Sequence, residues 1–121
     1  MKLFAIAGAV LGALAVAAGA FGAHGLESRL EPDALETWNT AARYQMYHAL
    51  ALLAAGTRGG EWVGAALSTA GWAWIGGTVV FSGSLYLLVW TDTDWLGAIT
   101  PIGGLALIVG WVAMAIAVAQ V

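Results

Sequence analysis

Three uncharged, apolar stretches dominate the pattern of hydrophobic and polar positions along the chain: residues 3–23, 62–90 and 95–119. A helix needs about 20 apolar residues to cross roughly 30 Å of hydrocarbon. Each stretch is long enough, and the second has a tryptophan at both ends, as is typical of residues at a bilayer interface. The pattern therefore predicts three membrane-spanning helices.

The segment between the first two stretches has a mixed pattern. Pro32 suits a first helical turn, because its missing N–H costs nothing there, and nothing after it breaks a helix before Gly56. Residues 32–43 are amphipathic and the rest is apolar, so we interpret residues 38–56 as a fourth span that begins in the interface. Because Arg43 then lies inside the membrane boundary, an interfacial or re-entrant helix is the alternative.

Composition also indicates a membrane protein. The 121 residues are 61% hydrophobic and only 9% charged, whereas soluble domains carry roughly 25% charged residues. The net charge of −3 leaves no basic surface for nucleic acid, and the lack of cysteine excludes disulfides and thiolate metal sites. We predict a single all-α domain over residues 1–121, a four-helix transmembrane bundle with short loops in contact with the lipid bilayer.

Four spans place both termini on one side of the membrane, together with the short loop around residues 57–61. That side carries Lys2 and Arg58, while the other carries Arg29 and most of the acidic residues. By the positive-inside rule, we expect a multi-pass protein of the cytoplasmic (inner) membrane with both termini in the cytoplasm.

Small residues recur at helical spacing. Gly8 and Gly12 are four residues apart on the first helix, and Ala15, Gly19 and Ala23 continue the same stripe. Ala73 with Gly77 and Ala106 with Gly110 form similar pairs on the third and fourth helices. Small side chains let membrane helices approach closely, so these positions predict contacts within the bundle. We expect Gly8 and Gly12 to tolerate alanine but not leucine. We also expect a homo-oligomer or a partner in a membrane complex.

Polar side chains inside a membrane are costly and therefore mark candidate functional positions. The first and third helices end where the second and fourth begin, which places the polar residues in the same half of the bilayer. The candidate ligand-binding residues are His24, Arg43, Tyr44, Gln45, Tyr47, His48, Ser82, Tyr86 and Thr100. We predict that they gather near the end capped by the first and third loops.

This polar cluster has two interpretations. In the structural one, hydroxyl groups bond to the preceding helical turn, and Arg43 reaches the headgroups or pairs with Glu36. In the other, the cluster is a vestibule that binds a small or lipid-derived molecule. An unpaired buried polar group costs about 1–3 kcal/mol. We therefore expect His48 to bond to the third helix, to the fourth near Thr100, or to His24.

Other chemistry is poorly represented. His24 and His48 differ in depth by roughly 10–15 Å, which disfavours ligation of one haem by both. No carboxylate shares the depth of His48, and no nucleophile with a matching base is present, so the sequence predicts no metal site and no cofactor. A non-enzymatic bundle that self-associates or serves as an accessory subunit is favoured. The alternatives are a binder or transporter of a small or lipophilic molecule and, last, a membrane redox protein or enzyme.

Four ordered motifs resemble a known family: residues 19–25 (GAFGAHG), 44–51 (YQMYHALA), 81–86 (FSGSLY) and 100–104 (TPIGG), the last followed by Gly110-Trp111. Together they resemble the YgdD/YwdK-like family of small uncharacterised bacterial inner-membrane proteins, which has mitochondrial relatives. The resemblance covers essentially the whole chain and implies a four-helix membrane protein. It supplies no catalytic residue, but among the candidates it marks His24, Tyr44, Gln45, His48, Ser82, Tyr86 and Thr100.

Overall fold

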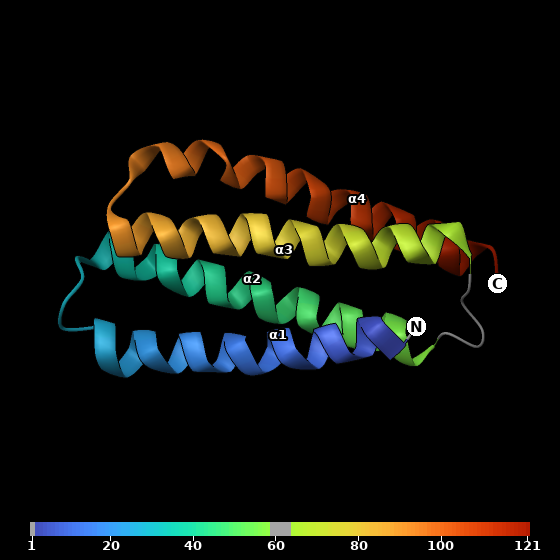
Figure 1. Cartoon of the computed structure of the whole chain (residues 1–121), viewed down its shortest axis with the longest axis horizontal. Helices are drawn as coiled ribbons and strands as arrows, with labels where there is room; N and C mark the ends of the chain where they lie inside the picture. Colours follow the sequence, from blue (N-terminus) through green and yellow to red (C-terminus); the bar gives the residue numbers. More distant parts are fainter. Residues whose placement is uncertain (1, 59–63) are drawn as a thin grey trace.

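Four long helices run up and down along one another in the computed structural model, which describes residues 2–58 and 64–121 (Figure 1). They are α1 (Lys2–Phe21), α2 (Pro32–Thr57), α3 (Ala65–Thr91) and α4 (Thr100–Ala119). Each helix packs against the next one in the chain, and both termini lie at the same end of the molecule. The predicted all-α helical bundle is confirmed.

The helix ends refine the predicted segments. α1 continues into a π-helical turn, Gly22–Leu26, and a 3-10 turn, Asp94–Ala98, precedes α4. Pro32 occupies the first turn of α2 as expected, and α2 passes through Gly56 to end at Thr57. The segment predicted as one helix over residues 95–119 is therefore a short turn followed by α4. The first two residues of the predicted third span, 62 and 63, lie outside the described residues.

Within the described residues, three helical segments are long and apolar enough to cross a membrane: Lys2–Leu26, Ala65–Thr91 and Asp94–Ala119. Large aliphatic side chains cover their outward surfaces, among them Leu14, Val79 and Ile102. Such apolar surfaces suit contact with the hydrocarbon of a bilayer, whereas on a soluble protein they would cause aggregation in water. α2 packs between α1 and α3, and its crossing of the membrane stays a prediction.

The apolar core occupies the end of the bundle that holds the termini. Phe4, Leu52, Leu67 and Trp74 are almost completely buried there, and Leu107 joins them from α4. All four long helices contribute to this cluster, so it holds one end of the bundle together. Most of the buried polar groups described below lie farther along, near the middle of α2 and α3.

Glycines allow the helices to approach closely, but not at every predicted position. A Cβ atom added to Gly8 would lie 2.6 Å from the carbonyl oxygen of Ala49. The expectation that alanine fits at Gly8 is therefore wrong, because the obstacle is backbone. At Gly12 the nearest atom is the Ala49 side chain at 3.8 Å, so alanine fits there. A Cβ atom added to Gly19 would meet no atom of another helix within 4 Å, so Gly19 makes no close helix contact.

Candidate functional site

Gln45 connects three helices at the centre of the bundle. Its side chain is buried, and its amide nitrogen donates a hydrogen bond of 2.8 Å to the carbonyl oxygen of Leu11 on α1. The hydroxyl of Tyr86 on α3 donates to the Gln45 amide oxygen at 2.7 Å. Both ends of the amide are thereby satisfied, so Gln45 joins α1, α2 and α3.

Two further candidates form hydrogen bonds between helices. The Ser82 hydroxyl donates to the carbonyl oxygen of Ala41 at 2.7 Å, which connects α3 to α2. The hydroxyl oxygens of Ser84 and Thr100 lie 2.6 Å apart, which connects α3 to α4. Thr78, one turn before Ser82, is buried and has no hydrogen-bond partner among residues 2–58 and 64–121. These polar groups mainly hold helices together.

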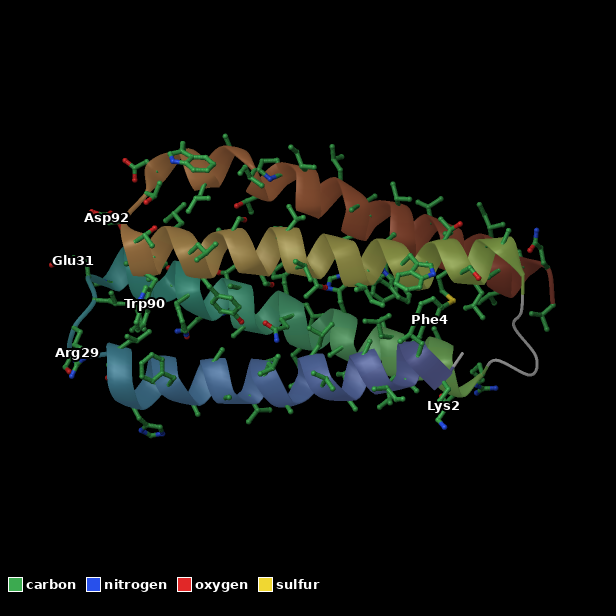
Figure 2. The ribbon with its side chains drawn as sticks, in the orientation of Figure 1. Lys2, Phe4, Arg29, Glu31, Trp90 and Asp92 are labelled. Carbon is green, nitrogen blue, oxygen red and sulfur yellow. The ribbon has the colours of Figure 1, made fainter. Side chains whose placement is uncertain are left out.

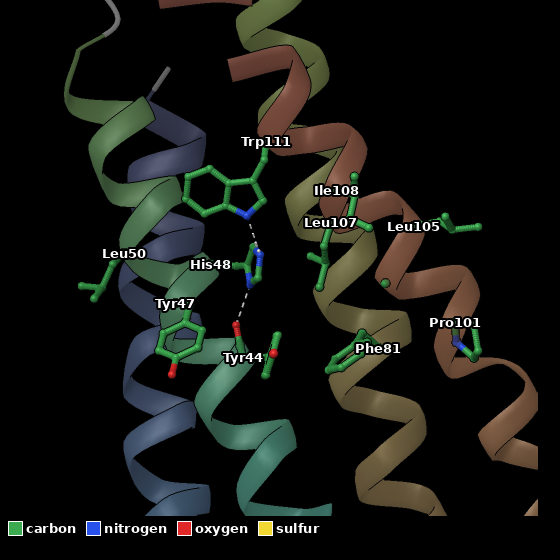
Figure 3. Close-up of a pocket in the computed structure, with 11 residues that line it drawn as sticks. Tyr44, Tyr47, His48, Leu50, Phe81, Pro101, Leu105, Leu107, Ile108 and Trp111 are labelled. Atoms are coloured by element: carbon green, nitrogen blue, oxygen red, sulfur yellow. Dashed lines mark hydrogen bonds between the residues drawn. The ribbon is translucent and has the colours of Figure 1, made fainter. Parts of the chain in front are cut away.

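His48 is hydrogen-bonded through both ring nitrogens (Figure 3). The indole nitrogen of Trp111 on α4 donates to Nε2 at 3.0 Å, and Nδ1 lies 2.7 Å from the carbonyl oxygen of Tyr44. Since Nε2 accepts a hydrogen bond from the indole N–H, the bonding pattern assigns the ring proton to Nδ1, which donates a hydrogen bond to that carbonyl. The ring is thereby fixed as one neutral tautomer between α2 and α4.

Sequence reasoning missed Trp111 as the partner of His48. We expected a group on α3, Thr100 with its neighbours, or His24, and interpreted the tryptophans as interface residues. The available signal was the Gly110-Trp111 motif at the end of the family resemblance. Trp111 lies in the second half of α4, so the His48 pair is farther from the loop end than the predicted cluster.

The remaining candidates are exposed. His24 lies on the surface in the turn after α1, and Arg43 is exposed on α2. The pairing of Arg43 with Glu36 that we considered is not formed, because Arg43 has no ion pair within the described parts of the chain. Tyr44 and Tyr47 are 39% and 49% exposed, and no atom of residues 2–58 and 64–121 hydrogen-bonds to either hydroxyl.

A groove of about 940 Å³ runs between α2 and α4 and is open on one side (Figure 3). Its walls are mainly apolar: α2 contributes Tyr44, Tyr47 and His48, α3 contributes Phe81, and α4 contributes Gly104 and Trp111. The His48–Trp111 pair bridges the two walls. The structure thus brings three of the sequence candidates, Tyr44, Tyr47 and His48, to one concave surface.

The described residues offer no group of three His, Asp or Glu side chains that could hold a metal ion. The groove instead presents aromatic rings, aliphatic side chains and the two tyrosine hydroxyls. Such a surface can hold an apolar molecule and donate hydrogen bonds to it.

Residues 18–104 match the family described as "Protein of unknown function (DUF423)", most of the chain. The chain belongs to the DUF423 family. It is similar to the UPF0382 membrane protein YwdK of Bacillus subtilis (strain 168), with 47% identity over 118 residues that cover 97% of this chain and 96% of that protein. The resemblance found in the sequence is confirmed.

A second relative is the UPF0382 membrane protein SAB0533 of Staphylococcus aureus (strain bovine RF122 / ET3-1). It is 49% identical over 117 residues, which cover 97% of this chain and 95% of that protein. No solved structure matches the chain. The names of these DUF423 relatives agree with the apolar helices, and the chain is a membrane protein. The family match includes Gln45 and His48, whereas Trp111 lies beyond it.

Proposed function

We propose that the protein acts by binding a lipophilic molecule in the groove between α2 and α4. The observation that carries this proposal is an open, apolar groove of about 940 Å³ with two tyrosine hydroxyls that have no partner in the described chain. Ligand sites are typically concave and mostly apolar, with a few polar groups that orient the ligand. On a membrane protein, molecules that reach such a groove come from the bilayer.

The buried hydrogen bonds support a binding role for the groove itself. Gln45, Ser82 and Thr100 are engaged in bonds between helices, so they are not free to receive a ligand. His48 is held by Tyr44 and Trp111, which fixes α2 and α4 on either side of the groove. A groove with a fixed width binds without the cost of ordering its walls.

The proposal is tested with a photoactivatable long-chain fatty alcohol added to membranes that contain the full chain. The matched variants are Gly104→Leu and Gly19→Leu. A Cβ atom at Gly104 would contact the Phe81 ring at 3.7 Å, so a side chain fits, and leucine fills the groove. Gly19 faces open space, so the same side chain there leaves the groove unchanged.

We expect labelled peptides to map to α2 and α4 around the groove, and labelling to fall several-fold in Gly104→Leu but not in Gly19→Leu. Labelling spread evenly over all outward-facing helix surfaces would contradict the proposal. Equal labelling of Gly104→Leu and the original chain would contradict it as well. Circular dichroism of each variant reports whether the helices are retained.

Self-association is the second candidate function, and the exposed face of α3 favours it. Gly76 and Gly83 have no atom within 4 Å of an added Cβ, and they alternate with the exposed Trp72 and Val79. In membranes, small residues on an open face let another helix approach. We propose that a second copy packs here. Gly83→Leu should then lower the apparent mass of the detergent-resolved particle, whereas a monomeric original chain would exclude this function.

The membrane orientation is also a proposal. Lys2 lies at the end of the bundle that holds the termini, whereas Arg29, Glu31 and Asp92 lie at the opposite end (Figure 2). This asymmetry supports an inner-membrane protein with both termini in the cytoplasm and with α2 as a fourth crossing.

A further inference from the structure

We infer that the groove takes a lipophilic quinone, an uncharged ring with carbonyl acceptors and an apolar tail. This inference rests on the proposed binding function and names the class of ligand. The first observation is depth. Gln45 donates to the carbonyl oxygen of Leu11, midway along the apolar α1. Tyr44 and Tyr47 lie within about 3 Å of Gln45 along the helix axis, so both side chains leave α2 level with the middle of α1.

This depth limits the polar part of a ligand. A charged group is costly there, and none of the described residues that line the groove carries a formal charge to balance it. The ester carbonyls of a glycerolipid lie at the border of the hydrocarbon core, about 15 Å from its centre. The groove therefore suits a ligand whose polar group is uncharged and lies within the hydrocarbon.

The groove offers hydrogen-bond donors to such a ligand. Neither the Tyr44 nor the Tyr47 hydroxyl has a partner in the described parts of the chain, whereas both ring nitrogens of His48 are engaged. In hydrocarbon no water satisfies a free hydroxyl. The two hydroxyls therefore gain most from a ligand that carries an acceptor. A carbonyl oxygen is such an acceptor, and it adds no charge.

The walls of the groove suit a flat ring. The Tyr44 ring packs beside Phe81 and Tyr47, with ring centroids 5.2 and 5.4 Å away (Figure 3). Across the groove, α4 contributes Gly104, whose lack of a side chain leaves its backbone open to a planar group. Aromatic side chains pair favourably with other planar π-systems in offset or edge-to-face arrangements. A conjugated ring gains these contacts, and a purely aliphatic molecule does not.

The length of the groove leaves room for an apolar tail. Along α4 the groove extends from Pro101 to Trp111, roughly 15 Å, which is longer than a single ring. Leu105 and Ile108 line this wall and supply aliphatic surface. Because the groove is open on one side, a longer tail can continue into the bilayer. Ring and tail together match a volume of about 940 Å³.

The experiment titrates decylubiquinone, a benzoquinone with a decyl tail, onto the detergent-solubilised full chain and follows binding by native mass spectrometry. The double variant Tyr44→Phe/Tyr47→Phe removes both hydroxyls and keeps the rings. Tyr86→Phe is the matched control, because its hydroxyl pairs with Gln45 and does not line the groove. The double variant should bind decylubiquinone roughly tenfold more weakly than the original chain, the scale of two net hydrogen bonds. Tyr86→Phe should bind it as the original chain does.

Equal decylubiquinone binding by the double variant and the original chain would overturn the inference, as would an equal loss in Tyr86→Phe. Binding of dioleoylglycerol, which has ester carbonyls but no ring, as tightly as decylubiquinone would overturn it too.

Labelling by the photoactivatable fatty alcohol separates this inference from the proposed function. We expect decylubiquinone to block labelling of the groove. If the alcohol labels the groove and decylubiquinone neither binds nor blocks that labelling, the groove stands and the quinone inference fails. If the alcohol does not label the groove of the original chain, the proposed function itself fails.

Discussion

At the scale of single residues, the polar side chains differ by whether a hydrogen-bond partner within the described chain holds them. Tyr86 donates to Gln45, whereas the Tyr47 hydroxyl has no partner in the described chain. In membrane proteins a hydrogen bond between helices contributes about 0.6 kcal/mol on average and up to about 1.7 kcal/mol. Satisfied groups of this kind stabilise the bundle, and unsatisfied exposed ones are available to a ligand.

The two tyrosines therefore respond differently to loss of the hydroxyl. Tyr86→Phe should lower the free energy of unfolding by about 1 kcal/mol, because the Gln45 oxygen loses its donor in a buried site. Tyr47→Phe removes an exposed hydroxyl and should leave stability within error. Reversible unfolding in mixed micelles measures both. Equal stability of the two variants would show that the Tyr86–Gln45 bond contributes nothing.

The His48–Trp111 pair leads to a spectroscopic prediction. Nitrogen NMR of the labelled imidazole should show the Nδ1–H tautomer, because Nε2 accepts a hydrogen bond from the indole N–H. Trp111→Phe keeps an aromatic ring but removes the donor, so the Nε2 resonance should shift. Trp72→Phe is the control, since Trp72 is exposed on α3 and lies apart from His48. An Nε2–H tautomer in the original chain would exclude the bond.

At the scale of helices, α1 and α2 approach closely at Gly8, because a residue without a side chain there lets the backbone of α2 come near the backbone of α1. Gly8 lies against the Ala49 carbonyl, while Gly12, one turn later, faces only the Ala49 methyl group. The small-residue spacing in the sequence is the same at both positions. The difference arises from the crossing of the two helices, which no pattern along one helix contains.

Alanine substitutions should separate these two glycines. Gly8→Ala should cost about 1–3 kcal/mol of stability, because its Cβ would overlap backbone that cannot move aside. Gly12→Ala should be neutral or stabilising by up to about 1 kcal/mol, because alanine favours the helix and the space is free. Thermal unfolding of the two variants in one detergent provides the comparison. A tolerated Gly8→Ala would show that α1 and α2 lie farther apart.

At the scale of the whole molecule, the sequence predicts the helices well and their lateral contacts poorly. Apolar stretches long enough to cross a bilayer predict α1, α3 and α4, and Pro32 marks the start of α2. The amphipathic pattern of α2 also indicates that Arg43 and Tyr47 share a face. The groove was not predictable, because it depends on how far α2 and α4 lie apart across α3. The bond from Trp111 to His48 spans 63 residues, and no periodicity indicates such a pair.

Membrane topology is a further prediction at this scale, and the absence of cysteine makes single-cysteine variants unambiguous. Thr57→Cys and Gln120→Cys should react with an impermeant reagent only from the cytoplasm. Ser28→Cys and Thr93→Cys should react only from the outside, because they lie at the other end of the bundle. Reaction of Ser28→Cys and Thr57→Cys from the same side would mean that α2 does not cross the membrane.

The central claim is that the groove between α2 and α4 holds a lipophilic ligand, and photo-crosslinking from two neighbouring positions tests it most directly. A photoreactive amino acid replaces Ile108, which lines the groove, or Val109, which is exposed beside it. After irradiation of intact membranes, position 108 should yield a discrete lipid adduct, and position 109 the mixed adducts of bulk lipid. Identical adducts from both positions would contradict the account.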